Sequence, residues 1–179
     1  MFISEEKKKT NIAEYVLYMW HIEDVIRACS FDIESIKNHV IVPQQLDEEK
    51  SHQLEQWYIG LIKKMKLQRI EKSGHLRDLS EIVNELSLLH QTLLDYYKDE
   101  KYADIFSKAE VFLEDFRKVA KAKTASHIAL FFEALYGKLI LKLKQKEISE
   151  ASEEAFAAFT KALGYLSIKY NEMKQGTLV

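Results

Sequence analysis

The feature that most constrains the fold is a long N-terminal helical segment with apolar residues on two opposite sides. The first apolar stripe recurs at alternating steps of three and four residues: Ile12, Tyr15, Met19, Ile22, Ile26, Cys29, Ile33, Ile36 and Val40. The second stripe consists of Ala13, Leu17, Trp20 and Phe31. A surface helix of a small bundle needs only one such stripe. We therefore expect this helix to be covered on both sides, either by its own chain or by another protein.

The composition favours one all-α domain with long helices. The 179 residues include one Pro and five Gly, far fewer turn-forming residues than a fold of short strands needs. Apolar residues make up 47% and charged residues 30%, a normal mixture for a globular protein. We predict a single domain over residues 1–179, with a polar tail at about 174–179. Because the predicted connections are short, we expect a compact bundle of six to seven antiparallel helices.

Net charge and cysteine content limit the partners and the cellular location that we expect for this protein. The formal net charge of −2 gives no overall attraction to nucleic acid or to a membrane surface. The single cysteine, Cys29, excludes an intramolecular disulfide. The N-terminus has no apolar stretch typical of a secretory signal, and no segment approaches the ~18 apolar residues of a membrane span. We expect a cytoplasmic protein without a membrane partner.

Capping residues and apolar seams predict the helix boundaries. Ser4 is the expected N-cap of a first helix that ends near Cys29. Ser30 or Asp32 would cap a short continuation. The later helices are predicted at about 47–71, 75–97, 101–121 and 125–146, followed by a last helix that Ser149 caps. The segment 128–143 is nearly all apolar, so we expect it at the centre of the bundle.

The first candidate site is a polar cluster beside Trp20 on the N-terminal helix, formed by His21, Glu23, Asp24 and Arg27. Asp24 and Glu23 precede Arg27 by three and four residues, so either carboxylate can pair with it. Asp24 and Arg27 interrupt the second stripe, and burial of that stripe would require paired charges. The favoured interpretation is an ion pair that fixes packing, and the alternative is the polar wall of a ligand site.

Glu133 is a second candidate because it interrupts the apolar segment 128–143. Ala129 and Gly137 lie on its helical face and would let another helix approach closely. Burial would then raise the pKa of Glu133, and the carboxyl group could serve as a general acid or base. The simpler alternative, which we favour, is a solvent-facing side chain or one that is hydrogen-bonded to a tyrosine.

A metal-binding site has little support in the sequence. Glu49 and His52 form one copy of the Glu-x-x-His spacing of di-iron bundles, which need two copies and further carboxylates. We therefore expect no metal and no cofactor.

Basic residues gather at the ends of the third and fifth predicted helices. They are Lys63, Lys64, Lys66, Arg69 and Lys72 in the third, and Arg117, Lys118, Lys121 and Lys123 in the fifth. In an antiparallel bundle both ends share one pole, which could meet phosphates. Cations at helix C-termini are also favoured by the helix dipole alone. We therefore do not expect nucleic acid as the partner.

Three segments, in this order, resemble a bacterial family of all-helical proteins described as a domain of unknown function. They are NIAEYVLYMWHIEDVIRACSFD, SGHL and ALYGKLILKLKQKEIS. The resemblance spans about Ile3 to Tyr170. It implies one compact helical domain and carries over no activity, cofactor or catalytic residue.

The favoured hypothesis is a non-catalytic interaction module that binds itself or another protein. Aromatic residues make up 11% of the chain, and Tyr and Trp are enriched in interface cores. Leu17, Trp20 and Phe31 are the expected interface residues. The alternative is a small-molecule-binding protein or enzyme, with a polar pocket near the first helix. The residues expected to line that pocket are His21, Glu23, Asp24, Arg27 and Glu133.

Overall fold

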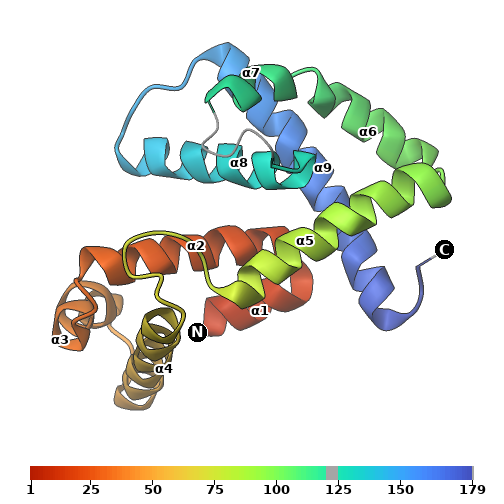
Figure 1. Cartoon of the computed structure of the whole chain (residues 1–179). Coiled ribbons are helices and arrows are strands. Elements are labelled where there is room, and N and C mark those ends of the chain that lie inside the picture. Colours follow the sequence, from red (N-terminus) through yellow and green to blue (C-terminus); the bar gives the residue numbers. More distant parts are fainter. Residues whose placement is uncertain (120–124, 179) are drawn as a thin grey trace.

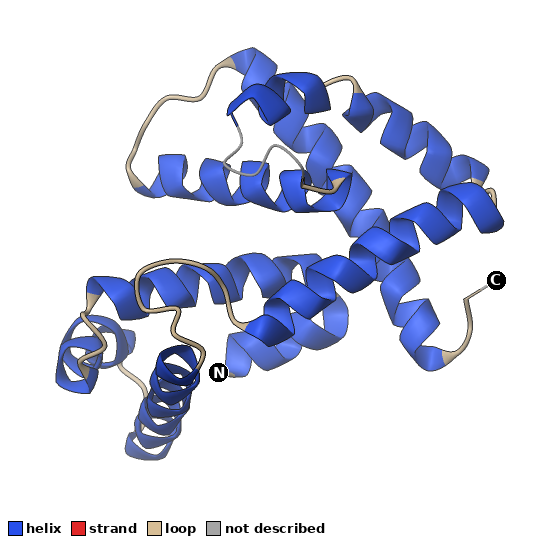
Figure 2. Cartoon of the chain, viewed as in Figure 1, coloured by secondary structure: helices blue, strands red, loops and turns tan. Residues whose placement is uncertain are grey.

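The computed structural model describes residues 1–119 and 125–178, and these residues form helices joined by turns, with no strand among them (Figure 2). The all-α class predicted from the composition is confirmed. The main helices are α1 (Phe2–Thr10), α2 (Ile12–Ala28), α3 (Ile33–Ile36), α4 (Glu48–Leu67), α5 (Arg77–Gln91), α6 (Glu100–Glu110), α7 (Leu113–Val119), α8 (His127–Leu143) and α9 (Glu150–Gln175). A π-helical turn and a 3₁₀ turn follow α3, at Lys37–Ile41 and Val42–Gln44, and a second π-helical turn extends α5 over Thr92–Tyr96. No helix in the described part of the chain is long and apolar enough to cross a membrane.

Helix starts follow side-chain caps. Asn11 has an extended backbone and accepts a hydrogen bond from the Glu14 N–H, so the predicted first helix is divided into α1 and α2. The helix α1 then folds back against α2 (Figure 1). Ser4, the expected N-cap, instead lies inside α1 and donates to the Met1 carbonyl at 2.6 Å. Asp32 and Ser149 cap α3 and α9 at their predicted positions.

Two helix ends differ from the sequence prediction. The helix α4 ends at Leu67 and is followed by residues 68–76, which we call the α4–α5 loop. Gly74 has φ +92° in this loop, a conformation that favours glycine. The fifth predicted helix is divided into α6 and α7, with a turn at Val111 and Phe112. Lys121 and Lys123 of the predicted basic pole lie outside the described residues.

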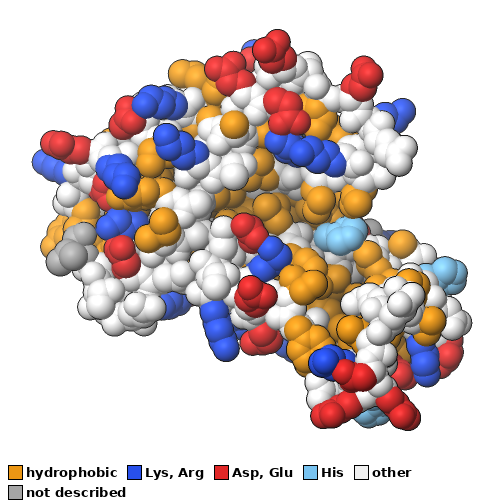
Figure 3. Space-filling model, turned by 180° about the vertical axis from the view of Figure 1, so that it is seen from behind, with side chains coloured by type: hydrophobic (Ala, Val, Ile, Leu, Met, Phe, Trp, Pro, Cys, Tyr) orange, Lys and Arg blue, Asp and Glu red, His pale blue; other side chains and the backbone are white. Residues whose placement is uncertain are grey.

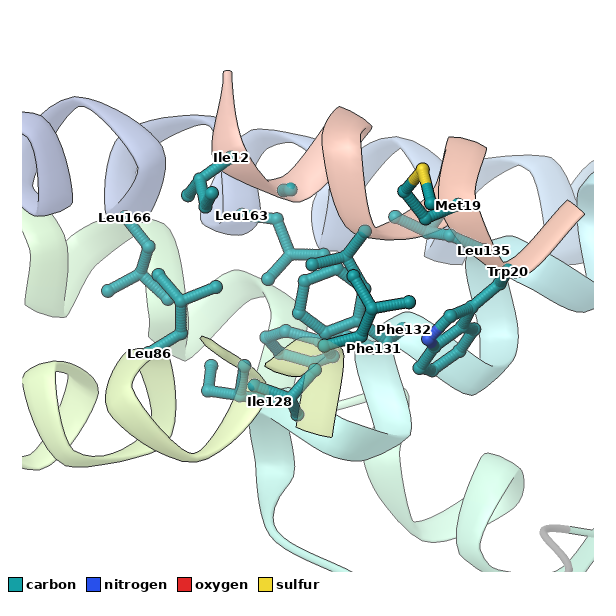
Figure 4. Close-up of a cluster of buried hydrophobic side chains, with 14 of the residues drawn as sticks. Ile12, Met19, Trp20, Leu86, Ile128, Phe131, Phe132, Leu135, Leu163 and Leu166 are labelled. Atoms are coloured by element: carbon teal, nitrogen blue, oxygen red, sulfur yellow. The ribbon is translucent and has the colours of Figure 1, made fainter. Parts of the chain in front are cut away.

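The core lies where α2, α5, α8 and α9 meet (Figure 4). Figure 4 shows side chains from all four helices converging, among them Met19, Leu86, Phe132 and Leu163. The rings of Phe131 and Phe159 stack at 4.4 Å between centroids. Only the first half of α8 is central, since its buried residues end at Leu135.

Both sides of α2 are largely covered within the chain. Met19 and Ile26 of the first stripe are 3% and 0% exposed, and Trp20, from the second stripe, is only 7% exposed. The surrounding helices are α5, α8 and α9. Leu17 and Phe31 are only partly buried. Internal packing therefore accounts for the burial of Trp20, the largest residue of the second stripe.

Candidate ligand-binding cleft

A cleft of about 890 Å³ lies beside the C-terminal half of α2. Figure 3 shows the surface hollowed on this side of the molecule, with hydrophobic side chains in the hollow. One face of α8 lines it at helical spacing, through Leu130, Glu133, Ala134, Gly137, Ile140, Leu141 and Lys144. The remaining lining residues are Trp20, Asp24, Arg27, Lys72, Ser73, Gly74, His75, Phe116, Tyr136 and Phe156. The cleft thus combines aromatic and aliphatic side chains with a polar group contributed by α2 and the α4–α5 loop.

Glu23 fixes the start of α5 against α2. Its side chain is 1% exposed, and its Oε1 accepts the Leu76 N–H at 2.8 Å. The other oxygen, Oε2, lies 2.6 Å from His75 Nδ1. Leu76 is the N-cap of α5 and has no capping hydrogen bond from its own side chain. Glu23 therefore supplies a negative group and an acceptor at this helix start, where both are favourable.

His75 is oriented by two neighbours and borders the cleft. Its ring stacks on Trp20, with 4.0 Å between centroids and 11° between planes. Because a carboxylate can only accept, we assign the Nδ1 proton to the bond with Glu23. Nε2 bonds to no described residue, and the side chain is 31% exposed. When the ring is neutral with its proton on Nδ1, Nε2 is a hydrogen-bond acceptor, and His75 is one of the residues that line the cleft.

Asp24 and Arg27 form the ion pair predicted from their spacing, at 2.8 Å between Oδ1 and Nη1. Arg27 also donates to the carbonyl of Ile70, from Nε at 3.3 Å and from Nη2 at 3.1 Å, and to the carbonyl of Gly74. The arginine thereby holds the α4–α5 loop against α2.

Tyr136 links α8 to the same group. Its hydroxyl donates to Asp24 Oδ2 at 2.5 Å and lies 3.3 Å from the Trp20 carbonyl. Burial and the adjacent Asp24 carboxylate raise the pKa of Tyr136, so its hydroxyl stays protonated and remains a donor.

The structure brings most of the predicted polar residues to one place. Asp24, Arg27 and Glu133 line the cleft, whereas Glu23 lies behind His75 and is not among the lining residues. Glu133 is partly exposed and forms no ion pair with a described residue. His21 is separate from the cleft, and its Nδ1 is buried without a partner among the described residues.

His75 and Tyr136 belong to this site but were not predicted as its residues from the sequence. His75 is 52 positions from its partner Glu23, and Tyr136 is 112 positions from Asp24. Local spacing gives no signal for either contact. The only local indication was that Tyr136 lies one helical turn after Glu133.

The metal candidates Glu49 and His52 lie outside this cleft, and of the basic candidates only Lys72 is among its described lining residues. Among the described residues, no group of three or more His, Cys, Asp or Glu side chains could hold a metal ion. Glu49 lines a separate depression of about 380 Å³ near Phe2, and His52 is exposed. In the basic group, Lys64 lies 3.6 Å from Asp78, whereas Lys72 lines the cleft.

A second histidine cluster lies in the core. His90 Nδ1 is 2.7 Å from the hydroxyl of Tyr102, and its Nε2 is 3.4 Å from Nδ1 of His127. Burial, with a smaller contribution from His127, lowers the pKa of His90 to about 4. Burial also raises the pKa of Tyr102. His90 is therefore neutral near pH 7, and none of the three residues lines the cleft.

Comparison with known proteins gives one match. The model of a family described as "Domain of unknown function (DUF4924)" matches residues 1–177. No curated protein and no solved structure matches the chain.

Proposed function

Because the chain belongs to the DUF4924 family, whose description names no activity, we propose a function from the cleft itself. We propose a non-catalytic binding protein that holds a small molecule between α2 and α8. The observation that carries this proposal is the cleft of about 890 Å³, which falls within the usual range of roughly 300–1,000 Å³ for small-molecule sites. Its mixture of apolar side chains and a few convergent polar groups is also typical of such sites.

The polar contacts support binding rather than catalysis. Asp24 accepts hydrogen bonds from Arg27 and from Tyr136, and Arg27 also donates to backbone carbonyls, which gives a fixed wall. Glu23 is occupied by His75 and the Leu76 N–H. A rigid wall of this kind favours ligand binding because little side-chain ordering remains to be done.

Self-association through Leu17 and Phe31 is our second proposal, since both side chains stay partly exposed on and beside α2. Trp20 is less available for such an interface because His75 and Tyr136 pack against it. We also propose that residues 1–179 act as one cytoplasmic domain, on the composition and cysteine content.

The test is native mass spectrometry of the protein purified from cells without chelator. Gly137 of α8 lines the cleft, and a Cβ built on it meets no atom within 4 Å, so Gly137→Trp should fill the cleft without disturbing the core. Gly60 of α4 is equally open and lies outside the cleft, so Gly60→Trp is the matched control. We expect additional ligand mass on the wild type and on Gly60→Trp, and its loss in Gly137→Trp.

Bound mass that survives Gly137→Trp would contradict the cleft as the binding site. A bare wild-type monomer that also shows no thermal shift with a small-molecule library would contradict the binding function. A bare dimer that Leu17→Glu or Phe31→Glu dissociates would instead support the second proposal.

A further inference from the structure

We infer that the cleft recognises an apolar molecule that carries a hydrogen-bond-donating group, a hydroxyl or an amine, and that Asp24 and Nε2 of His75 accept its bonds. This inference rests on the proposed function and specifies the ligand class of the same site. It depends on which hydrogen-bonding groups of the wall are already used and which are left.

Two donor side chains of this wall, Arg27 and Tyr136, are committed to the protein itself, whereas the Nε1–H of Trp20 is buried and has no partner among the described residues. Arg27 makes four hydrogen bonds with its five N–H groups, to Asp24, Ile70 and Gly74. The Tyr136 hydroxyl, whose single proton is its only donor, is directed at Asp24. A ligand acceptor that approaches Arg27 or Tyr136 would therefore have to displace an internal bond.

The acceptors, by contrast, have capacity left. Each Asp24 oxygen has one partner, the side chain is 45% exposed, and a carboxylate offers about four acceptor positions. His75 uses Nδ1 for Glu23 and leaves Nε2 without a partner among the described residues. Glu133 adds to the same cleft a carboxylate that has no ion-pair partner among the described residues.

Asp24 and His75 lie on the same wall. Arg27 bonds both to Asp24 and to the carbonyl of Gly74, the residue before His75. Trp20 extends this wall, with His75 stacked on its ring and its carbonyl beside the Tyr136 hydroxyl. Both acceptors therefore belong to the side of the cleft that α2 and the α4–α5 loop form.

The apolar lining determines where the rest of the ligand lies. Phe116, Phe156 and Leu130 line the cleft together with the open backbone of Gly137. Lys72 and Lys144 also line it, but both are exposed residues with flexible side chains that can extend into water. These two lysines are the groups that would favour an anionic ligand, so the experiment must compare ligands of both kinds.

Three indole probes share one apolar body and differ only in the terminal group: tryptophol has a hydroxyl, tryptamine an ammonium and indole-3-acetate a carboxylate. Dissociation constants come from NMR titration of the full chain. We expect tryptophol and tryptamine to bind about tenfold more tightly than indole-3-acetate, which corresponds to roughly one extra hydrogen bond. Gly137→Trp should abolish binding of all three.

Two variants locate the effect. Asp24→Asn replaces one acceptor oxygen with a donor amide, so the preference over indole-3-acetate should fall to about twofold or less. Asp104→Asn is the matched control, because Asp104 also forms a short-range ion pair on its helix, with Lys108, but lies outside the cleft. It should keep the wild-type preference. Thermal unfolding of each variant confirms that the fold is intact.

The outcomes separate this inference from the proposed function. Equal or tighter binding of indole-3-acetate, in a manner that Gly137→Trp abolishes, overturns the donor preference and leaves the binding function in place. An unchanged preference in folded Asp24→Asn overturns the role of Asp24. Failure of all three probes to bind at millimolar concentration counts against the binding function and the inference together.

Discussion

The two histidine clusters of this protein contain similar groups in opposite settings. His75 borders a cleft, stacks on Trp20 and bonds to the carboxylate of Glu23. His90 is 6% exposed, packs against aromatic rings and bonds to the hydroxyl of Tyr102. The His75 ring has a carboxylate partner and access to solvent, whereas the His90 ring is buried and is bonded to a hydroxyl.

This difference separates a residue that is available for binding from one that only fills the core. Without a carboxylate beside it, the buried imidazole of His90 is disfavoured in its charged form, and its pKa falls to about 4. The carboxylate beside His75 fixes the ring and leaves its second nitrogen accessible. A histidine among aromatic residues is therefore a binding candidate only when its partner and its exposure both allow it.

The largest effect should follow from removing Glu23. Glu23→Ala leaves the Leu76 N–H and His75 Nδ1 without their acceptor, and we expect the free energy of unfolding to fall by about 3 kcal/mol. Glu23→Gln keeps one acceptor for the Leu76 N–H and should lose less. Urea denaturation measures both. A loss below about 0.5 kcal/mol for Glu23→Ala would show that the start of α5 does not depend on this contact.

Acidification should destabilise the fold through His90. Its folded-state pKa of about 4 lies below the ordinary value of 6.5, so the unfolded chain takes up a proton first as the pH falls. Stability is therefore unaffected by this group above pH 6.5 and declines between pH 6.5 and about 4. The decline is at most about 1.4 kcal/mol per pH unit and about 3 kcal/mol in total.

Comparison with His90→Gln isolates this contribution from the other histidines. Glutamine does not titrate and can still bond to Tyr102. The difference in unfolding free energy between wild type and variant should change with pH across that window. A difference that stays constant would mean that His90 takes up its proton equally in the folded and unfolded states.

The hydroxyl of Tyr102 should contribute a smaller amount. Tyr102→Phe leaves the buried His90 Nδ1 without its partner, and we expect a loss of about 1.5 kcal/mol. Tyr165→Phe is the control, because that hydroxyl bonds to Asp99 in a partly exposed position. Thermal unfolding measures the stability that each variant loses, and we expect the larger loss in Tyr102→Phe. Equal losses in the two variants would contradict this expectation.

The smallest effect is expected at the cleft. Tyr136→Phe removes a hydroxyl that is partly exposed, so its loss should lower the unfolding free energy by about 0.5–1 kcal/mol. It also frees one lone pair on Asp24, so the affinity for tryptophol should be kept or improved. Tyr96→Phe, at a highly exposed position, should change neither quantity. A tenfold weaker affinity for tryptophol in Tyr136→Phe would show that the tyrosine itself contacts the ligand.

Local features of the sequence predicted the helical class and several caps. Scarce Pro and Gly indicated long helices, and Asp32 and Ser149 begin helices where expected. The break at Asn11 also had a signal, since Glu14 follows it by three residues, but the N-cap was assigned to Ser4 and one helix was expected from there to Cys29. The end of α4 had no such signal in the sequence. The chain turns there through Arg69, a non-glycine residue at φ +56°.

The site was predictable only where its contacts are local. Asp24 and Arg27 are three residues apart on one helix, and their pairing followed from spacing. The partners of Glu23 lie 52 and 53 positions away, on a loop whose path depends on tertiary packing. Sequence spacing cannot supply such contacts, and for the same reason it placed His21 with a cluster that the fold leaves apart.

The many contacts of α9 have a consequence for biosynthesis. This helix touches α1, α2, α5, α6 and α8, and the Ala13 N–H donates to Ser167 Oγ across 154 positions of the chain (Figure 1). At a synthesis rate of about 5–20 residues per second, α2 emerges roughly 7–30 seconds before its last covering helix. The part of α2 that α9 covers stays open during that interval. The nascent chain therefore passes through a period in which it depends on dilution or on a chaperone to avoid aggregation.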